Sequence, residues 1–250
     1  MSLVRSTLFG CALLLTPALS PLAAPACPST PPTAPMALPH LLSAVSHGVE
    51  GLIVALGSSS TQGAMASDLA HSYPAVLQQA LSAALPEAHV AVINRGIGGQ
   101  DATEEVARLD ADVLAVRPQL VIWQVGANGA LRNADPAVFR STVAAGVRRL
   151  QAAGADVILM DNQQSPALLA RASEPEFDHE LAGVARDTGA ALFSRRALMQ
   201  AWSHEGAPLV QFIASDGLHH NNHGYQCIAQ SLASAVVDAL TPAPPLTASR

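Results

Sequence analysis

The chain reads Leu52-Ile53-Val54-Ala55-Leu56-Gly57-Ser58-Ser59-Ser60-Thr61 where an unbroken apolar run passes into a glycine and four hydroxyl residues. Because the apolar residues do not alternate with polar ones, this run predicts a strand covered on both faces, as in a parallel sheet. Similar short apolar runs follow at 90–93, 120–125, 157–160 and 191–193. Together they predict a five-stranded parallel sheet.

Longer segments with helical spacing lie between these runs, at 69–85, 103–116, 136–153 and 175–188, and a last one spans about 222–240. Strand and helix therefore alternate along the chain, which predicts one three-layer α/β/α domain. We expect a flavodoxin-like sheet with strand order 2-1-3-4-5. The expected helix N-caps are Asp101 or Thr103, and Asp135, while Gly154 and Gly189 are expected to end helices.

The ends of the chain differ in composition from its middle. Residues 1–26 resemble an export signal, with Arg5 before a short apolar stretch and Ala24-Pro25-Ala26 as a small-residue cleavage site. Residues 27–48 are rich in Pro, Ala and Ser and are expected to form an irregular arm. The predicted domain occupies 49–240, and 241–250 is expected to be a flexible tail. We therefore expect a secreted or periplasmic protein that is soluble and has no transmembrane segment.

Two cysteines remain after the predicted cleavage, Cys27 and Cys227. In an oxidising compartment they can form one disulfide that ties the N-terminal arm to the last helix. Two unpaired thiols are the first alternative. The second is a lipoprotein in which Cys27 is the lipidated first residue.

The overall composition excludes some classes of partner. Half of the 250 residues are hydrophobic and 13% are charged, which is enough apolar material for a sizeable core. A net charge of −6, with no block of Lys or Arg, gives no basis for nucleic-acid binding. The oligomeric state stays open.

Four segments of distinctive composition follow predicted strands or precede the last predicted helix: Ser59, Gly96–Gly99, Gly126–Asn128, and Asp216 with His219. In an open parallel sheet, ligands bind outside the carboxyl ends of the strands, where the strand order reverses. With the expected strand order, the first three loops would be neighbours there. The sequence therefore predicts one site at this edge.

The residue types in these segments suit acyl transfer through a serine. The Ser59 hydroxyl is a weak nucleophile until a base takes its proton. His219 is the candidate base, and Asp216 would fix its tautomer and orientation. His219, His220 and His223 also leave a metal site open as an alternative, but glycines and asparagines around them favour a loop and a helix start, so no metal or cofactor is expected.

An acyl-transfer reaction also needs donors for a negatively charged oxygen. The N–H groups of Ser59 and Gly99 and the side chain of Asn128 are the candidates for this oxyanion hole. The glycine-rich turn before Asp101 could instead hold a phosphate, although Arg95 is the only basic residue close to it in the sequence.

Taken together, the four segments resemble the marker blocks of the SGNH branch of the GDSL hydrolases, over about residues 50–240. The matching residues, in chain order, are Ser59, Gly99, Asn128 and His219. The resemblance implies hydrolysis of a small-molecule or glycan ester through an acyl-serine intermediate, without a metal. The sequence departs from the family pattern at two positions: Ser58, where the family name has Asp, and Gly129, where an Asp often follows the Asn.

Two rival functions remain beside ester hydrolysis: transfer of an acyl group to a glycan, and binding without catalysis. The scarcity of aromatic residues and the lack of a long apolar insertion favour small or water-soluble esters. The loop Asp161-Asn162-Gln163-Gln164 is expected to be solvated, with a place in the substrate pocket as the alternative.

Overall fold

The computed structural model describes residues 26–29 and 34–241. The predicted export signal, except for Ala26, and the tail beyond Thr241 therefore lie outside the described residues. Within these two ranges, no helix is long and apolar enough to cross a bilayer.

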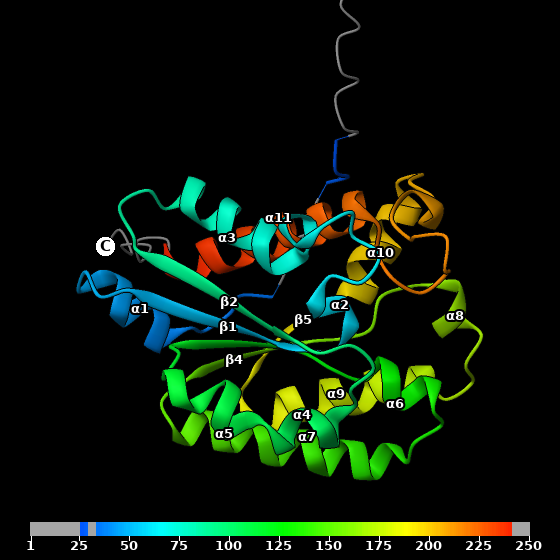
Figure 1. Ribbon diagram of the computed structural model, residues 1–250, viewed down its shortest axis with the longest axis horizontal. Coiled ribbons are helices and arrows are strands. Elements are labelled where there is room, and N and C mark those ends of the chain that lie inside the picture. Colours follow the sequence, from blue (N-terminus) through cyan, green and yellow to red (C-terminus); the bar gives the residue numbers. More distant parts are fainter. Residues whose placement is uncertain (1–25, 30–33, 242–250) are drawn as a thin grey trace, which may run out of the picture.

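Five parallel strands form one sheet in the order β2-β1-β3-β4-β5 (Figure 1). They are β1 (Gly51–Gly57), β2 (Val90–Gly96), β3 (Leu120–Gln124), β4 (Asp156–Met160) and β5 (Ala191–Phe193). The predicted fold class and strand order are thus confirmed. At the carboxyl edge of the sheet, Gly57 pairs with Gly96 on one side and with Gln124 on the other. This register brings the loops after the first three strands together.

Helices cover both faces of the sheet, and each face has its own apolar core (Figure 1). On one face the core includes side chains from α1 (Pro39–Ser46), α3 (Tyr73–Ala84), α10 (Arg195–His204) and α11 (Asn222–Leu240). On the other it includes side chains from α4 (Ala102–Ala107), α5 (Leu109–Asp112), α7 (Pro136–Ala152) and α9 (Glu174–Thr188). Short pieces complete the domain: α2 (Ser59–Gln62), α6 (Ala127–Leu131), α8 (Pro166–Leu169), and the 3₁₀ turns η1 (Leu69–His71), η2 (Leu114–Val116) and η3 (Leu209–Gln211).

The prediction of an irregular arm over 27–48 is wrong for its second half, which forms α1. Pro39 occupies the first turn of this helix, where a missing N–H costs nothing. Leu41 is fully buried in the core, and its N–H donates to the Asp156 carboxylate at 2.9 Å. The proline-rich composition concealed a helix that is stabilised by its packing against the sheet.

Two predicted helices are interrupted. The segment 103–116 divides into α4, α5 and η2, with a break at Arg108, whose guanidinium donates to the Gly57 carbonyl at 3.0 Å. Asp101 caps α4 by accepting from the N–H groups of Thr103 and Glu104, so the alternative cap at Thr103 is wrong. The segment 69–85 begins with η1 and becomes α-helical only from Tyr73. Helix α10 was not predicted.

The other helix ends agree with the sequence. Asp135 caps α7 through the N–H groups of Ala137 and Val138. Gly154 and Gly189 follow α7 and α9 with φ of +85° and +72°, a conformation that favours glycine. Of the three states considered for the two cysteines, the structure has the disulfide between Cys27 and Cys227. It joins the N-terminal arm to α11 across 200 residues.

Candidate active site

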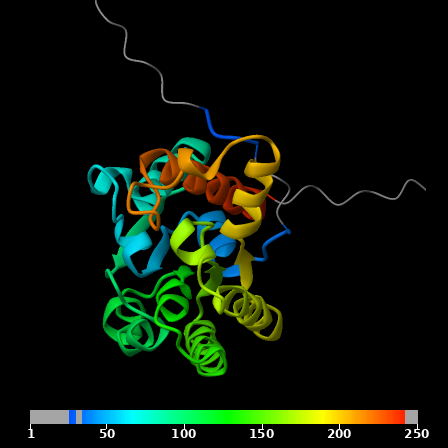
Figure 2. The same ribbon diagram turned by 90° about the vertical axis from the view of Figure 1, so that its right-hand side faces the viewer.

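Ser59 is the first residue of α2, and only Ser58 separates it from the end of β1. The helix fits there because two glycines let it approach the sheet closely. A Cβ on Gly57 would lie 2.3 Å from Thr61 Oγ1, and one on Gly96 would lie 2.1 Å from the backbone nitrogen of Gln62. The two glycines thus allow α2 to hold Ser59 at the carboxyl edge of the sheet, the end of the molecule that Figure 2 faces.

The structure brings Ser59, His219 and Asp216 into one hydrogen-bonded line. Ser59 Oγ lies 2.7 Å from His219 Nε2, although 160 residues separate them in the chain. His219 Nδ1 lies 2.6 Å from Asp216 Oδ2. Because a carboxylate only accepts, Nδ1 carries the proton and Nε2 is free to accept from the serine. The geometry is that of a nucleophile, a base and a residue that orients the base.

Asp216 is held as a charged acceptor. Its Oδ1 accepts from the N–H groups of Leu218 and His219, each at 3.0 Å. Burial acts to raise the pKa of Asp216, but the hydrogen bond from His219 and those from the backbone outweigh it, so the pKa is lowered overall. The carboxylate is therefore ionised at neutral pH and fixes the imidazole.

The structure also distinguishes among the three serines that follow Gly57. Ser58 is buried and donates from Oγ to Gln124 Oε1 at 3.2 Å. Ser60 is buried as well. Among the described residues, only Ser59 of the three has a hydrogen bond to His219.

The segments with Gly99 and Asn128 meet beside Ser59. A Cβ on Gly98 would lie 3.9 Å from the Ser59 Cβ, and the place of a Cβ on Gly99, with φ of +81°, is open. Asn128 lies in the first turn of α6 and donates from Nδ2 to the Gln100 carbonyl at 2.7 Å. This bond ties Asn128 to the residue after Gly99 and leaves one N–H of its amide free.

Gly129, one of the two departures from the family pattern, has a packing reason. A Cβ at this position would lie 2.6 Å from Cε1 of Phe177, whose ring contacts Phe139 at 4.9 Å between centroids. An aspartate at 129 would not fit without moving Phe177.

The prediction of a solvated loop at 161–164 is wrong, because the first three side chains are buried. Gln163 donates from Nε2 to the Leu218 carbonyl at 2.9 Å, and Ala167 N–H donates to the Gly217 carbonyl at 3.0 Å. The segment after β4 therefore holds the loop that carries Asp216 and His219. No local pattern marked Gln163, since its partner lies 55 residues away.

The three neighbouring histidines have separate surroundings. His219 contacts Ser59 and Asp216. The His220 ring is fully buried, with Nδ1 3.2 Å from the Phe212 carbonyl. His223 stacks on the Phe212 ring at 5.3 Å between centroids. Of the three rings, only that of His219 takes part in the hydrogen-bonded line with Ser59, while those of His220 and His223 both contact Phe212.

Buried His220 makes the stability of the fold sensitive to acid. Burial, aided by the positive charge of Arg195, lowers its pKa from 6.5 to about 3. The stabilisation from neutral His220 is thus present above pH 6.5 and is lost as the pH falls toward 3, because the unfolded chain binds a proton that the folded protein does not. Because of His220, we expect the free energy of unfolding to fall by about 2 kcal/mol between pH 7 and pH 5.

Urea unfolding of the wild type and His220→Gln at both pH values measures this loss. Asp178 acts in the opposite direction, because burial raises its pKa to about 7. The test therefore compares the loss of unfolding free energy between the two pH values in the wild type with the loss in His220→Gln. His89→Gln, at an exposed position, is the matched control. Equal losses in the wild type and His220→Gln would refute the assignment.

Comparison with known proteins gives consistent matches. The sequence model of the Non-GDSL lipase-like family matches residues 24–242. An arylesterase of Vibrio mimicus is 28% identical over 199 residues, which cover 80% of this chain and 94% of that protein. Esterase TesA of Pseudomonas aeruginosa is 28% identical over 64% of this chain and 75% of its own length.

Solved structures share the fold. A two-domain esterase active on acetylated mannans, crystallised with mannopentaose, superposes with a TM-score of 0.69 at 25% identity, over 83% of this chain. The chain spans about half of that protein, 55% of its length. The crystal structure of TesA superposes with a TM-score of 0.64 at 23% identity, over 76% of this chain and 99% of its own.

Proposed function

This chain belongs to the Non-GDSL lipase-like family, and on that premise we propose that it hydrolyses esters with Ser59 as nucleophile, His219 as general base and Asp216 as the residue that orients the base. The observation that carries the proposal is the hydrogen-bonded line from Ser59 Oγ through His219 to Asp216. The chain is a carboxylic ester hydrolase of the SGNH type, as its sequence resemblance predicted. Acyl transfer to a glycan is not favoured, because the matched relatives are esterases.

The reaction proceeds in two halves. Ser59 Oγ attacks the ester carbonyl as His219 Nε2 takes the hydroxyl proton, and His219 then returns that proton to the departing alcohol. The product of this half is an ester of Ser59. Water then attacks the acyl-serine while His219 accepts its proton, and the acid leaves as Ser59 regains a proton.

Negative charge develops on the carbonyl oxygen in both halves. The N–H groups of Ser59 and Gly99 and the free N–H of the Asn128 amide are assigned to this oxygen. Each such donor contributes roughly 3–4 kcal/mol to transition-state stabilisation. The bond from Asn128 to the Gln100 carbonyl supports the assignment, because it fixes the amide before the substrate arrives.

Short acyl groups are the proposed substrates. Aromatic residues make up only 4% of the chain, and one structural relative is described as active on acetylated mannans. A series of nitrophenyl esters of increasing acyl length tests this. We expect kcat/KM to be highest for acetyl and butyryl esters and to fall about tenfold or more for long chains. A maximum at long chains would contradict the substrate class but not the ester hydrolysis.

Gln163 is proposed as a positioning residue for His219. Gln163→Leu removes the donor to the Leu218 carbonyl and lets the loop with His219 shift. Since misplacement of a catalytic group by about 1 Å can cost 10²-fold, we expect kcat to fall about 10- to 100-fold while KM changes little. The acid limb of the pH–rate profile should move as well, which a purely structural loss would not cause.

Gln164→Leu is the matched control, because Gln164 is half-buried in the same loop and has no hydrogen bond to another described residue. It should keep the wild-type kcat. If Gln163→Leu changes only the unfolding free energy, with kcat and the pH profile unaltered, Gln163 does not position His219.

Export is also part of the proposal. Residues 1–26 act as a signal peptide, and the disulfide between Cys27 and Cys227 supports an oxidising compartment. The intact mass of protein recovered outside the cytoplasm tests this, since it should correspond to a chain that begins near Cys27 and carries no free thiol. A chain that keeps residues 1–26 would contradict the cleavage.

A further inference from the structure

The face formed by α3 and α11 is unusually poor in charge for a surface that solvent reaches. The two helices pack side by side on the sheet (Figure 1). Asp238, near the end of α11, is the only Asp, Glu, Lys or Arg in either of them. On the opposite face, α9 alone carries Glu174, Glu176, Asp178, Glu180, Arg186 and Asp187. Solvated helix faces normally carry charged residues, so the neutral face needs another explanation.

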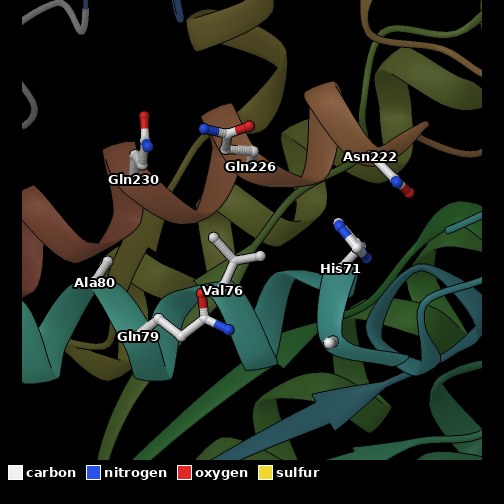
Figure 3. A pocket seen from close by; sticks show the side chains of 8 residues that line it. His71, Val76, Gln79, Ala80, Asn222, Gln226 and Gln230 are labelled. Carbon is white, nitrogen blue, oxygen red and sulfur yellow. The ribbon is translucent and has the colours of Figure 1, made fainter. Parts of the chain in front are cut away.

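A groove of about 480 Å³ runs between these helices. Figure 3 shows Asn222, Gln226 and Gln230 along α11, with Val76 and Gln79 of α3 across from them. His71 and two alanines complete the lining. Every polar side chain in the groove is thus an amide or an imidazole, and none is a carboxylate, an ammonium or a guanidinium.

The glutamines of the groove are available to a ligand. Within the described part of the chain, the side-chain amides of Gln79, Gln226 and Gln230 have no hydrogen-bond partner. Gln78, the neighbour of Gln79, is fully engaged instead: its amide donates to Ser82 and the Val90 carbonyl and accepts from Val92. Each free amide offers two donors and one acceptor, the combination that pairs with a hydroxyl group in either direction.

The chemistry of the groove excludes several classes of occupant. Nucleic acids and anionic membranes are bound by Lys and Arg, which the groove lacks. Stable protein interfaces are enriched in aromatic residues, Met and Arg at their centres, and the groove contains none of these. A neutral, hydroxyl-rich ligand matches uncharged amides beside small apolar side chains.

The groove begins beside the catalytic loop. Asn222, at its end, follows His219 by three residues and is fixed by two bonds to Ser67, one from the Ser67 N–H and one to the Ser67 hydroxyl, each at 2.8 Å. From there to Gln230 the helix rises about 12 Å, at 1.5 Å per residue. A chain-like ligand in the groove would therefore extend away from Ser59 with one end near it.

We propose that this groove binds a neutral oligosaccharide chain, the polymeric part of a substrate whose ester group is presented to Ser59. Only the presentation of the ester group to Ser59 rests on the proposed ester hydrolysis. Binding of the sugar chain itself depends on the amides of the groove.

The kinetic test compares acetylated mannan with nitrophenyl acetate, which is too small to occupy the groove. In the double variant Gln79→Ala/Gln226→Ala, we expect KM for acetylated mannan to rise about fivefold or more, from the loss of two sets of hydrogen bonds. kcat/KM for nitrophenyl acetate should stay within about twofold of the wild type. Gln200→Ala, an exposed glutamine on α10 outside the groove, is the matched control and should change neither value.

A binding test measures sugar binding in the groove independently of catalysis. Mannopentaose and xylopentaose are titrated into Ser59→Ala protein, and amide NMR shifts are followed at millimolar sugar concentrations. Shifts at the glutamines of the groove that disappear in the double variant support the proposal, and the two sugars identify the backbone type. Absence of shifts there with both sugars, or a double variant that cleaves acetylated mannan like the wild type, overturns it. Failure of the wild type to cleave nitrophenyl acetate would instead refute the hydrolase mechanism.

Discussion

Ser59→Ala is expected to lower kcat for nitrophenyl acetate by roughly 10⁴- to 10⁶-fold, the size of effect found when the nucleophile of a serine hydrolase is removed. The variant lacks the oxygen that becomes acylated, and no other described hydroxyl has a hydrogen bond to His219. Initial rates of the purified variant measure the loss, and a fluorophosphonate probe that labels the wild type should fail to label it.

The neighbouring serines provide the control for this experiment. Ser60→Ala removes the hydroxyl of a buried residue in the same helix that has no hydrogen bond to His219, so it should keep the wild-type rate within about tenfold. Circular dichroism should show that both variants fold. A Ser59→Ala protein that is folded and fully active, or a Ser60→Ala protein that is folded but inactive, would mean that Ser59 is not the nucleophile.

The second large effect concerns stability. Removing the bond between Cys27 and Cys227, in Cys27→Ala/Cys227→Ala, frees a loop of 200 residues in the unfolded chain. On the chain-entropy account, a loop of this length corresponds to at most about 5 kcal/mol of unfolding free energy, a large share of the total for one domain. Urea unfolding of wild type and variant, each with and without dithiothreitol, measures it.

Reduction of the wild type provides the internal control for this prediction. Dithiothreitol should lower the urea midpoint of the wild type toward that of the double variant and leave the variant unchanged. Equal midpoints for the oxidised wild type and the double variant would show that the disulfide adds nothing to stability. In that case α1 and the sheet would hold the N-terminal arm without a covalent bond.

The matched relatives are esterases, which indicates ester hydrolysis as the class of reaction. The surface of this chain gives evidence about its substrate. The triad and the groove between α3 and α11 make separate demands on a substrate, one for an ester carbonyl and one for neutral hydroxyls. An acylated neutral polysaccharide meets both. The kinetic comparison of acetylated mannan with nitrophenyl acetate tests whether one molecule uses them together.

Much of the architecture can be predicted from local patterns of apolar and polar residues in the sequence. Continuous apolar runs such as 52–56 predict doubly covered strands, because a side chain buried on either face of a parallel sheet is apolar. Their alternation with helical segments predicts the layers and, through the edge rule of open sheets, places the loops after Gly57, Gly96 and Gln124 at one crevice. These inferences depend only on neighbours in the chain and on the geometry of a sheet.

Other features depended on contacts between distant segments. The residue types alone left the choice among three serines open, and only the family resemblance pointed to Ser59. The structure supplies the physical reason, because Ser59 alone of the three has a hydrogen bond to His219. Helix α1 was hidden by its proline-rich surroundings, since its stability comes from burial of Leu41.

The loop at 161–164 looked solvated because its residues are polar, yet Gln163 is buried through its bond to Leu218. The groove likewise arises from the outer faces of two helices that are about 140 residues apart in the chain, at residues 76–80 and 222–230. Local composition and periodicity thus determined the strands, the layers and the chemical types at the site. The tertiary structure decided which side chains meet, because a polar residue is buried or exposed according to the partners that folding brings to it.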